Sequence, residues 1–328
     1  MGTHVREARD VLAIDAERET ERIVEAIRQV VFYQFKRKGA VVGVSGGIDS
    51  SVVAALCARA LGPDRVLGLL MPEGESSPDS VVLGRQLAES LGIRSEMVDI
   101  TPMLDASRCY RRRDDAIRLV VPEYGAGWKC KITLPDLIAA DQIALFSVVV
   151  QSPAGERRKV RLTLEAYLGM VAASNMKQRT RKMVEYYHAD RLNFAVAGTP
   201  NRLEYELGFF VKCGDGAADF KPIAHLYKTQ VYQLAEYLEI PKEIQERPPT
   251  TDTYPLEQSQ EEFYFSMPLS KMDVCLYGRD HGTAASELAP MVELTADQVQ
   301  RAYSMIDRKR AHARYLHRSP VCFGETSS

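Results

Sequence analysis

Cysteine is scarce in this sequence of 328 residues, and the few cysteines do not form recognisable groups. A disulfide framework or a zinc site would need paired or regularly spaced cysteines. There is no C-x-x-C pair and no zinc-like spacing among the six, which are Cys57, Cys109, Cys130, Cys213, Cys275 and Cys322. We therefore expect reduced thiols and a cytoplasmic protein.

Long apolar runs and a strong charge of either sign are also missing. No apolar run reaches the length of roughly 20 residues that spans a bilayer. Residues 1–22 are too highly charged for a secretory signal, and Arg6 stands where myristoylation at Gly2 would need Ser or Thr. The formal net charge of −2 gives no general attraction to nucleic acid or membranes. The hydrophobic content of 45% is typical of a globular core, and 328 residues are enough for one large domain or two small ones.

The most informative stretch that is present is AVVGVSGGIDSS, at residues 40–51. The β-branched run from Val41 to Val44 predicts a buried strand, and the Ala-rich residues 52–61 predict a helix. A strand, a glycine turn and a helix in this order direct backbone N–H groups toward an anion. The two glycines let the main chain approach phosphate oxygens closely, because they have no Cβ atom. Asp49 would repel a bare phosphate, so it indicates a bridging Mg²⁺.

This motif differs from two common phosphate-binding loops. It lacks the GK[ST] of a Walker loop and the third glycine of a dinucleotide fingerprint. An ordinary turn capped by Ser or Asp is the structural alternative, but the run SGG-x-DSS directly after a strand favours a functional loop. The run resembles the pyrophosphate loop of the ATP pyrophosphatases, which cleave ATP to AMP and pyrophosphate and activate a carboxylate or carbonyl as an adenylate. The loop alone does not distinguish among their members.

The rest of the chain alternates predicted helices and strands. Apolar periodicity predicts helices over residues 15–38, 78–91, 164–187 and 229–238, and strands over residues 66–70, 95–100 and 192–197. Strands separated by helices predict a parallel sheet with right-handed crossovers. Ligands of such sheets bind at the carboxyl ends of the strands, where both the glycine motif and the polar run GTPNRLE at 198–204 fall.

Residues 105–162 interrupt this alternation. Ile143 to Val150 and Lys159 to Leu162 predict the two arms of a hairpin around residues 152–155. The segment is either a surface elaboration or a lid or partner contact, and the sequence does not decide between them. The run Arg111 to Arg113 is more typical of a solvated face than of a binding patch.

Within the predicted helix 164–187, Asn175, Arg179 and Lys182 lie on one face. Such a polar run is often only the solvated side of a helix. Alternatively, Asn, Arg and Lys together can grip a phosphorylated or carboxylate ligand, because a guanidinium matches the geometry of these anions. Both interpretations stay open from the sequence alone.

Taken together, an ordered set of blocks resembles the NAD synthetases, in their ammonia-dependent form. The match covers roughly residues 20–105 and 163–265. The blocks are SGGIDSS at 45–51, MPEGESS at 71–77, NMKQRTRKM at 175–183, GTPNRLE at 198–204, GFFVKCGDGAADFKPI at 208–223, LYKTQV at 226–231 and PPTTD at 248–252. Their order makes the resemblance far more specific than the glycine loop alone.

The resemblance implies a fold, an assembly and a reaction. The fold is α/β, a parallel sheet flanked by helices on both faces of the adenine nucleotide alpha hydrolase-like type, assembled as a homodimer. The reaction is the ATP-dependent amidation of nicotinate adenine dinucleotide by ammonia, giving NAD, AMP and pyrophosphate. We expect a single domain over residues 1–328 with an insert at about 105–162. The roughly 40 residues before Ala40 cannot hold a glutaminase domain, so ammonia is either free or delivered by another protein.

The resemblance also implies roles for individual residues, with ATP as co-substrate and Mg²⁺ as cofactor. Catalysis is implied for Asp49 and Lys228, and metal binding for Asp49 and Glu204. ATP binding is implied for Ser45, Gly46, Gly47, Ile48, Ser50, Ser51, Thr199, Lys228 and Thr250. Binding of the dinucleotide substrate is implied for Asn175, Arg179, Phe209, Lys212, Asp215 and Asp219.

The sequence departs from the family pattern around the expected acceptor pocket. Cys213 replaces the usual aromatic residue, and residues 253–265 lack the usual Leu-Gly after the acidic pair Glu261-Glu262. The basic His-Lys-Arg motif near the C-terminus has two candidates, Lys309-Arg310 and His317-Arg318. These changes leave the ATP loop intact.

Because of these departures, the sequence leaves alternative functions open. One alternative is a related ATP pyrophosphatase that amidates a different small carboxylate, such as a sugar acid. Another is a non-catalytic nucleotide-binding partner, although retention of both Asp49 and Glu204 argues against it. A tRNA-thiolating role is disfavoured, since neither a cysteine pair nor a basic face is visible.

Overall fold

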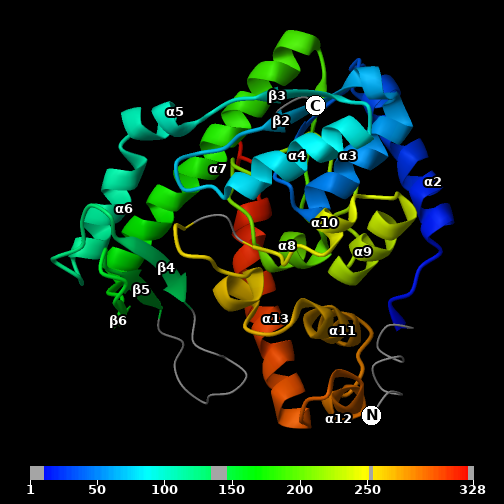
Figure 1. Ribbon diagram of the computed structural model, residues 1–328. Coiled ribbons are helices and arrows are strands. Elements are labelled where there is room, and N and C mark those ends of the chain that lie inside the picture. The colour runs from blue at the N-terminus through cyan, green and yellow to red at the C-terminus, as the bar shows by residue number, and fades with distance from the viewer. Residues whose placement is uncertain (1–10, 134–145, 251–253, 324–328) are drawn as a thin grey trace.

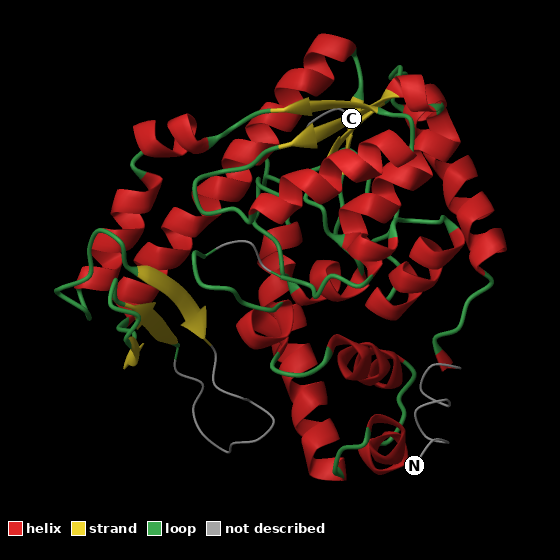
Figure 2. Ribbon diagram, in the orientation of Figure 1, coloured by secondary structure: helices red, strands yellow, loops and turns green. Residues whose placement is uncertain are grey.

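A four-stranded parallel sheet lies at the centre of the protein (Figures 1 and 2). The computed structural model describes residues 11–133, 146–250 and 254–323. In spatial order, the strands are β3 (Arg94–Met97), β2 (Val66–Leu70), β1 (Ala40–Gly43) and β7 (Ala195–Ala197). All neighbouring strands are parallel, which confirms the predicted α/β class.

Alternate residues of the sheet pack into two separate cores. Ala40 and Val42 of β1 point into one core, whereas Val41 points into the other, as the period of two along a strand requires. The first core contains side chains from α2 (Ala16–Arg28), α3 (Ile48–Leu61), α4 (Pro78–Ser90) and α9 (Lys228–Tyr237). The second contains side chains from α5 (Thr101–Ala106), α6 (Cys109–Arg118) and α7 (Leu164–Leu192). Helices therefore cover both faces, as predicted.

Several predicted elements have different bounds in the structure. The predicted helix 15–38 is α2 followed by a π-helical turn, η1 (Gln29–Gln34), and Asp15 caps it by accepting a hydrogen bond from the Arg18 N–H at 3.0 Å. Helix α7 extends to Leu192, so the predicted strand 192–197 is reduced to β7. Strand β3 ends at Met97 instead of residue 100.

A third core lies beneath the carboxyl edge of the sheet. It is formed mainly by elements of the C-terminal half, and its centre includes Phe265, Met272 and Ile306. The elements of this half not yet named are α8 (Arg202–Leu207), α10 (Lys242–Gln245), η3 (Glu261–Phe265), α11 (Leu269–Asp280), α12 (Ala285–Leu288), η4 (Ala289–Val292) and α13 (Ala296–His317). Because α13 packs on α8, the last helix of the chain lies next to the polar edge of the sheet (Figure 1).

The segment expected to be an insert forms a small sheet of its own. Its strands β4 (Lys129–Thr133), β5 (Ser147–Gln151) and β6 (Arg157–Arg161) are antiparallel, in the order β4-β5-β6. This confirms the predicted hairpin, although residues 143–145 of its first arm lie outside the described residues. Strand β4 was not predicted. The small sheet packs on α6 and α7 through a fourth core that includes Ile132, Val148 and Met170.

The arginine run in this segment is only partly the solvated face that the sequence favoured. Arg113 is buried, and its guanidinium lies 2.6 Å from the Glu75 carboxylate. Lys177 of α7 binds Glu75 at 2.7 Å and Glu73 at 2.9 Å. A buried ionic network therefore joins α6 and α7 to the loop after β2. Spacing along the sequence does not reveal this packing role of Arg113.

Two further observations concern membranes and metals. In the described part of the chain, every helix is too short or too polar to cross a bilayer. The same residues contain no group of three or more His, Cys, Asp or Glu side chains arranged to hold a metal ion. All six cysteines are unpaired.

Candidate active site

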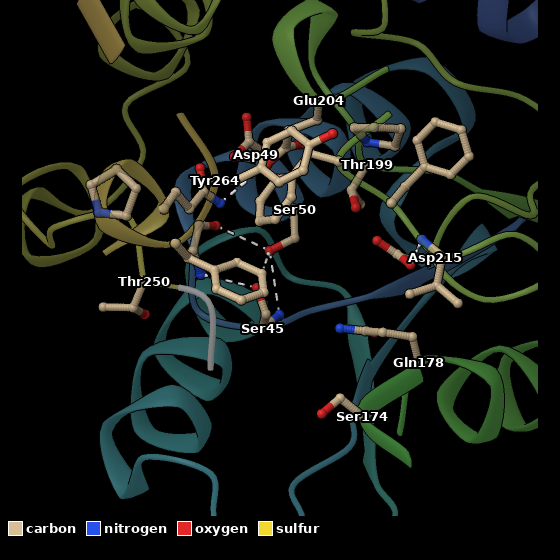
Figure 3. A pocket seen from close by; sticks show the side chains of 18 of the residues that line it. Ser45, Asp49, Ser50, Ser174, Gln178, Thr199, Glu204, Asp215, Thr250 and Tyr264 are labelled. Atoms are coloured by element: carbon tan, nitrogen blue, oxygen red, sulfur yellow. Dashed lines mark hydrogen bonds between the residues drawn. The ribbon is translucent and has the colours of Figure 1, made fainter. Parts of the chain in front are cut away.

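A cavity of about 1370 Å³ opens at the carboxyl edge of the central sheet. Its walls come from the turn after β1, the loop after β7, helix α7, residues 247–250 and 260–264, and helix α13. Figure 3 shows Ser45, Asp49, Glu204 and Asp215 around this space, with Ser174 and Gln178 of α7 facing the turn. Residues distant in sequence therefore share one pocket at the predicted edge.

The glycine turn has the geometry expected of an anion-binding loop. Gly46 has φ +72°, and a Cβ at this position would lie 2.8 Å from the Ser80 carbonyl oxygen, so glycine is required. Helix α3 begins directly afterwards, with Gly47 as N-cap. The hydroxyls of Ser50 and Ser51 donate to the Gly47 carbonyl at 3.0 and 2.8 Å. The turn thus presents the N-terminus of a 14-residue helix to the cavity.

Not every residue of the predicted ATP loop faces the cavity. Its lining includes Ser45, Gly47, Ile48, Asp49 and Ser50, together with Thr199, Lys228 and Thr250. Gly46 and Ser51 do not line it. Ser51 is completely buried, and its hydroxyl is used by the Gly47 carbonyl. Gly46 and Ser51 therefore shape the turn without facing the cavity.

Asp49 and Lys228 form an ion pair at the centre of the site. The Asn201 amide also donates to the Asp49 carboxylate at 3.0 Å. Burial lowers the pKa of Lys228, but the charges of Asp49 and Glu204 outweigh this effect and raise its pKa overall. The buried carboxylate of Asp273 accepts hydrogen bonds from the N–H groups of Lys228 and Thr229, at 3.2 and 2.7 Å. Asp273 therefore fixes the start of α9, and with it the position of Lys228.

Glu204 is the second carboxylate of this centre. It belongs to the capping box of α8: its Oε2 accepts from the Asn201 N–H at 3.2 Å, while the Asn201 side chain accepts from the Glu204 N–H at 3.2 Å. The Gln260 amide donates to the other oxygen at 3.1 Å. Burial and the nearby charge of Asp49 raise the pKa of Glu204 to about 8. A cation arriving here would relieve the repulsion between the two carboxylates.

The residues expected to bind the dinucleotide divide into two groups. Asn175, Phe209 and Asp215 line the cavity, and burial raises the pKa of Asp215. The other three do not line it; they are Arg179, Lys212 and Asp219.

These three side chains hold neighbouring backbone instead. Arg179 donates to the Lys212 carbonyl at 3.2 Å. Lys212 donates to the carbonyls of Tyr315 and Arg318, at 3.1 and 3.0 Å. The carboxylate of Asp219 accepts from the Val196 N–H at 2.7 Å. In this state of the protein they support the cavity wall from outside, and their binding roles stay predictions.

Of the two candidate basic motifs near the C-terminus, only Lys309 lines the cavity. Its ammonium lies 3.2 Å from the centre of the Tyr264 ring and donates to the Tyr264 carbonyl at 2.9 Å. Burial, reinforced by the charge of Arg308, lowers its pKa to about 7. Arg310 instead pairs with Glu206 and Asp280, and the His317 ring contacts the Tyr205 carbonyl at 2.8 Å.

Cations outnumber carboxylates in the described cavity lining. The seven Lys and Arg side chains are Arg181, Lys182, Lys228, Arg247, Arg301, Arg308 and Lys309; the four Asp and Glu side chains are Asp49, Glu185, Glu204 and Asp215. The whole chain, in contrast, has a net charge of −2. The cavity is therefore suited to anionic ligands. Sequence reasoning missed Arg247, Arg301 and Arg308, because none of them belongs to the matched blocks, although Arg247 stands next to one and Arg308 stands next to the candidate basic motif Lys309-Arg310.

Comparison with known proteins agrees with this geometry. A profile of the NAD synthase family matches residues 19–120 and 155–316. The chain belongs to the NAD synthase family. Among curated members, it is 57% identical to the NH(3)-dependent NAD(+) synthetase of Mesorhizobium japonicum, over 95% of this chain and 98% of that protein. It is 35% identical to the NH(3)-dependent NAD(+) synthetase of Thermotoga maritima, over 77% of this chain and 84% of that protein.

Solved structures of NAD synthases and a related enzyme share the fold. The NMN synthetase from Francisella tularensis aligns with a TM-score of 0.66 and 21% identity, covering 95% of this chain and all of that one. The NH3-dependent NAD synthetase from Campylobacter jejuni aligns with a TM-score of 0.61 and 22% identity, with the same coverage. The NAD synthase profile skips residues 121–154, which contain β4 and β5 but neither α5 nor α6.

Arg247 is a cavity-lining cation that braces the glycine turn. Its guanidinium donates to the Gly46 carbonyl at 3.3 Å and to the Ser80 hydroxyl at 3.0 Å, and no carboxylate of the described residues forms an ion pair with it. We predict that Arg247→Met weakens ATP binding about 10- to 100-fold, because a hydrogen bond to a charged group contributes about 1.5–3 kcal/mol. Calorimetric titration with ATP measures the change. Arg279→Met, which breaks a surface pair with Asp307, is the control; unchanged ATP affinity in the Arg247 variant would contradict the prediction.

The lowered pKa of Lys309 predicts a pH-dependent contribution to anion binding. Below its pKa of about 7, the ammonium is charged and attracts an anionic nucleotide; above it, this attraction is lost. We therefore expect the affinity ratio between the wild type and Lys309→Met to be largest near pH 6 and to approach one by pH 8.5. Titrations of both proteins with ATP and with nicotinate adenine dinucleotide provide the ratio, in which the titration of the ligand itself cancels. A ratio that is flat with pH for both ligands would refute this.

Proposed function

We propose that this NAD synthase uses ATP and ammonia to amidate nicotinate adenine dinucleotide, giving NAD, AMP and pyrophosphate. The observation that carries this proposal is one cavity that combines the glycine turn, the pair Asp49 and Glu204, and an excess of cations. Its volume of about 1370 Å³ exceeds the range of roughly 300–1,000 Å³ that is usual for a single drug-sized ligand. The names of the curated relatives support the same activity.

The chemistry explains why an anion-binding cavity is needed. A carboxylate is a poor electrophile, and its charge repels nucleophiles. In the first step a carboxylate oxygen of the substrate attacks the α-phosphorus of ATP, and the bond to the β-phosphate breaks, releasing pyrophosphate. In the second step the nitrogen of ammonia attacks the acyl carbon, the bond to AMP breaks, and the nitrogen loses a proton. The work of the protein is to position two anions and to neutralise their charge.

The residues fit a magnesium ion bound together with a nucleotide. Asp49 and Glu204 are both carboxylates of the cavity wall, and the raised pKa of Glu204 reflects burial and the charge of Asp49. Mg²⁺ in nucleotide sites is usually held by one or two carboxylates, the remaining ligands being waters and phosphates. The absence of a three-carboxylate group in the described residues agrees with this arrangement. When bound, the ion would neutralise phosphate charge, and Asp49 and Glu204 would hold it.

The activity is tested directly with purified protein, ATP, Mg²⁺, an ammonium salt and nicotinate adenine dinucleotide. We expect NAD, AMP and pyrophosphate in equal amounts. Asp49→Asn and Glu204→Gln should each lower kcat/KM about 10²- to 10³-fold, the usual effect of removing a group that stabilises transition-state charge.

The control for these variants is Glu123→Gln, because Glu123 is an exposed surface carboxylate. It should retain wild-type activity. Absence of NAD with the wild-type protein would end the proposal. ATP turnover with a different acid, such as a sugar acid, would indicate that this acid is the acceptor.

We also propose that the protein is a homodimer in the cytoplasm, with contact along α7. Four exposed apolar side chains lie on this helix, spaced as two pairs four residues apart: Leu164 and Leu168, and Met183 and Tyr187. A helix face of this kind can pair with its own copy about a two-fold axis. The unpaired cysteines support a reducing compartment.

Charge introduced on α7 tests the dimer. We expect Met183→Glu combined with Tyr187→Glu to yield monomers in light scattering, because the two carboxylates would face their copies across the axis. Val82→Glu changes an equally exposed apolar residue on α4 and should leave the dimer intact. A double variant with the same mass in solution as the wild type would exclude contact through this face.

A further inference from the structure

Strand β4 contacts the segment 256–262, the end of which forms the start of η3. The Leu256 N–H donates to the Cys130 carbonyl at 3.2 Å, and the buried Gln258 amide donates to the Ile132 carbonyl at 2.5 Å. Lys131 adds an ion pair with Glu262 at 2.7 Å. Three consecutive residues of one strand thus bind the segment, and Tyr254, just before it, is buried in the core of the small sheet.

The same segment delivers Gln260 to the active centre. The Gln260 amide N–H donates to Oε1 of Glu204 at 3.1 Å, while Oε2 of Glu204 accepts from the Asn201 N–H. The two carboxylate oxygens of Glu204 therefore accept hydrogen bonds from two different parts of the chain. One donor belongs to the cap of α8, and the other belongs to the segment that β4 supports. Among the described residues, Gln260 is the side chain from outside α8 and its cap that donates to Glu204.

The carbonyl oxygen of Gln260 has no obvious structural purpose. It is buried and has no hydrogen-bond partner among the described residues, although Gln260 lines the cavity. An unpaired buried acceptor costs stability, and because Gln260 lines the cavity, a bound ligand can supply the missing donor. The opposite amide orientation would place the carbonyl against the Glu204 carboxylate, where two acceptors would repel.

We propose that Gln260 is a positioning residue for Glu204, and that β4 of the insert holds it in place. On this view β4, one strand of the insert, supports the active site: it fixes one oxygen of the metal-binding carboxylate through the path β4, Gln258, Gln260 and Glu204. The role of Glu204 in this inference rests on the proposed function. The path itself consists of contacts within the chain.

The sharpest test compares three glutamine-to-methionine variants of similar volume. Gln260→Met removes the bond to Glu204, and Gln258→Met removes the bond to β4. Gln151→Met is the matched control, because Gln151 lies on β5 of the same small sheet and contacts Arg157 there. The main readout is binding of Mn²⁺, as a spectroscopic substitute for Mg²⁺, in the presence of a non-hydrolysable ATP analogue, followed by electron paramagnetic resonance.

We expect Gln260→Met to weaken Mn²⁺ binding about 10- to 100-fold, as is typical when a residue that orients a metal ligand is lost. Gln258→Met should weaken it by a smaller factor, and Gln151→Met should leave it unchanged. In activity assays, Gln260→Met should raise the Mg²⁺ concentration for half-maximal rate by a similar factor. Thermal unfolding in the absence of metal checks that each variant is folded, and Gln258→Met provides a second route if Gln260→Met is not.

Wild-type Mn²⁺ affinity in folded Gln260→Met would overturn the positioning role. Wild-type affinity in folded Gln258→Met, together with loss in Gln260→Met, would refute the part assigned to the insert. These outcomes differ from failure of the proposed function, in which the wild-type protein binds Mn²⁺ with the ATP analogue but makes no NAD.

Discussion

The ion pair between Lys228 and Asp49 is the interaction on which the arrangement of the site depends. Two carboxylates, Asp49 and Glu204, are held close together at a largely buried position, and without a cation their repulsion would force them apart or protonate one of them. Lys228 supplies that cation. Under the proposed function, a magnesium nucleotide would bring both a metal for the carboxylates and phosphates for the ammonium, and would replace the ion pair without leaving a buried charge unpaired.

The three charged side chains come from separate elements, and the topology of the sheet brings them together. Asp49 lies in the first turn of α3, Glu204 in α8 after β7, and Lys228 at the start of α9. Since β1 and β7 are parallel neighbours, the loops that follow them emerge at the same edge of the sheet. Asn201 then connects the two carboxylates, as it donates to Asp49 and caps the helix of Glu204. The site is therefore a consequence of sheet topology combined with helix capping.

Much of the fold and part of the site were predictable from the sequence, and the predictions that were wrong or missing have physical reasons. The turn at 45–51 and the polar run at 198–204 were located correctly because strand ends carry strong local signals. Arg179 lies outside the lining because spacing along a helix identifies a face, but not which neighbouring backbone that face meets. Lys212 lies in the loop between α8 and α9, and its role was expected only from the family resemblance, which does not show that its ammonium binds backbone carbonyls. Arg247 could not be predicted from local pattern, since its function depends on the carbonyl of Gly46, 201 residues away in the chain. Strand β3 is shorter than predicted because the apolar residues Val98 and Ile100 continue past the end of its pairing with β2. Strand β7 begins later than predicted because α7 continues through the mostly polar residues 188–191 to Leu192.

Strand β4 lies in the segment that the sequence analysis expected to be an insert, and it contacts the described part of residues 253–265, the other segment expected to depart from the family pattern. The described part of that segment donates backbone and side-chain hydrogen bonds to β4, at the carbonyls of Cys130 and Ile132, and these contacts fix its position. A strand with one free edge is normally a liability, because its unpaired groups invite other strands; here β4 uses that edge to hold a neighbouring segment. The edge of β4 and the segment are therefore held together by contacts between residues that lie far apart in the sequence. This also explains why β4 escaped prediction: a five-residue strand has a weak signal when its partners on both sides lie far along the sequence.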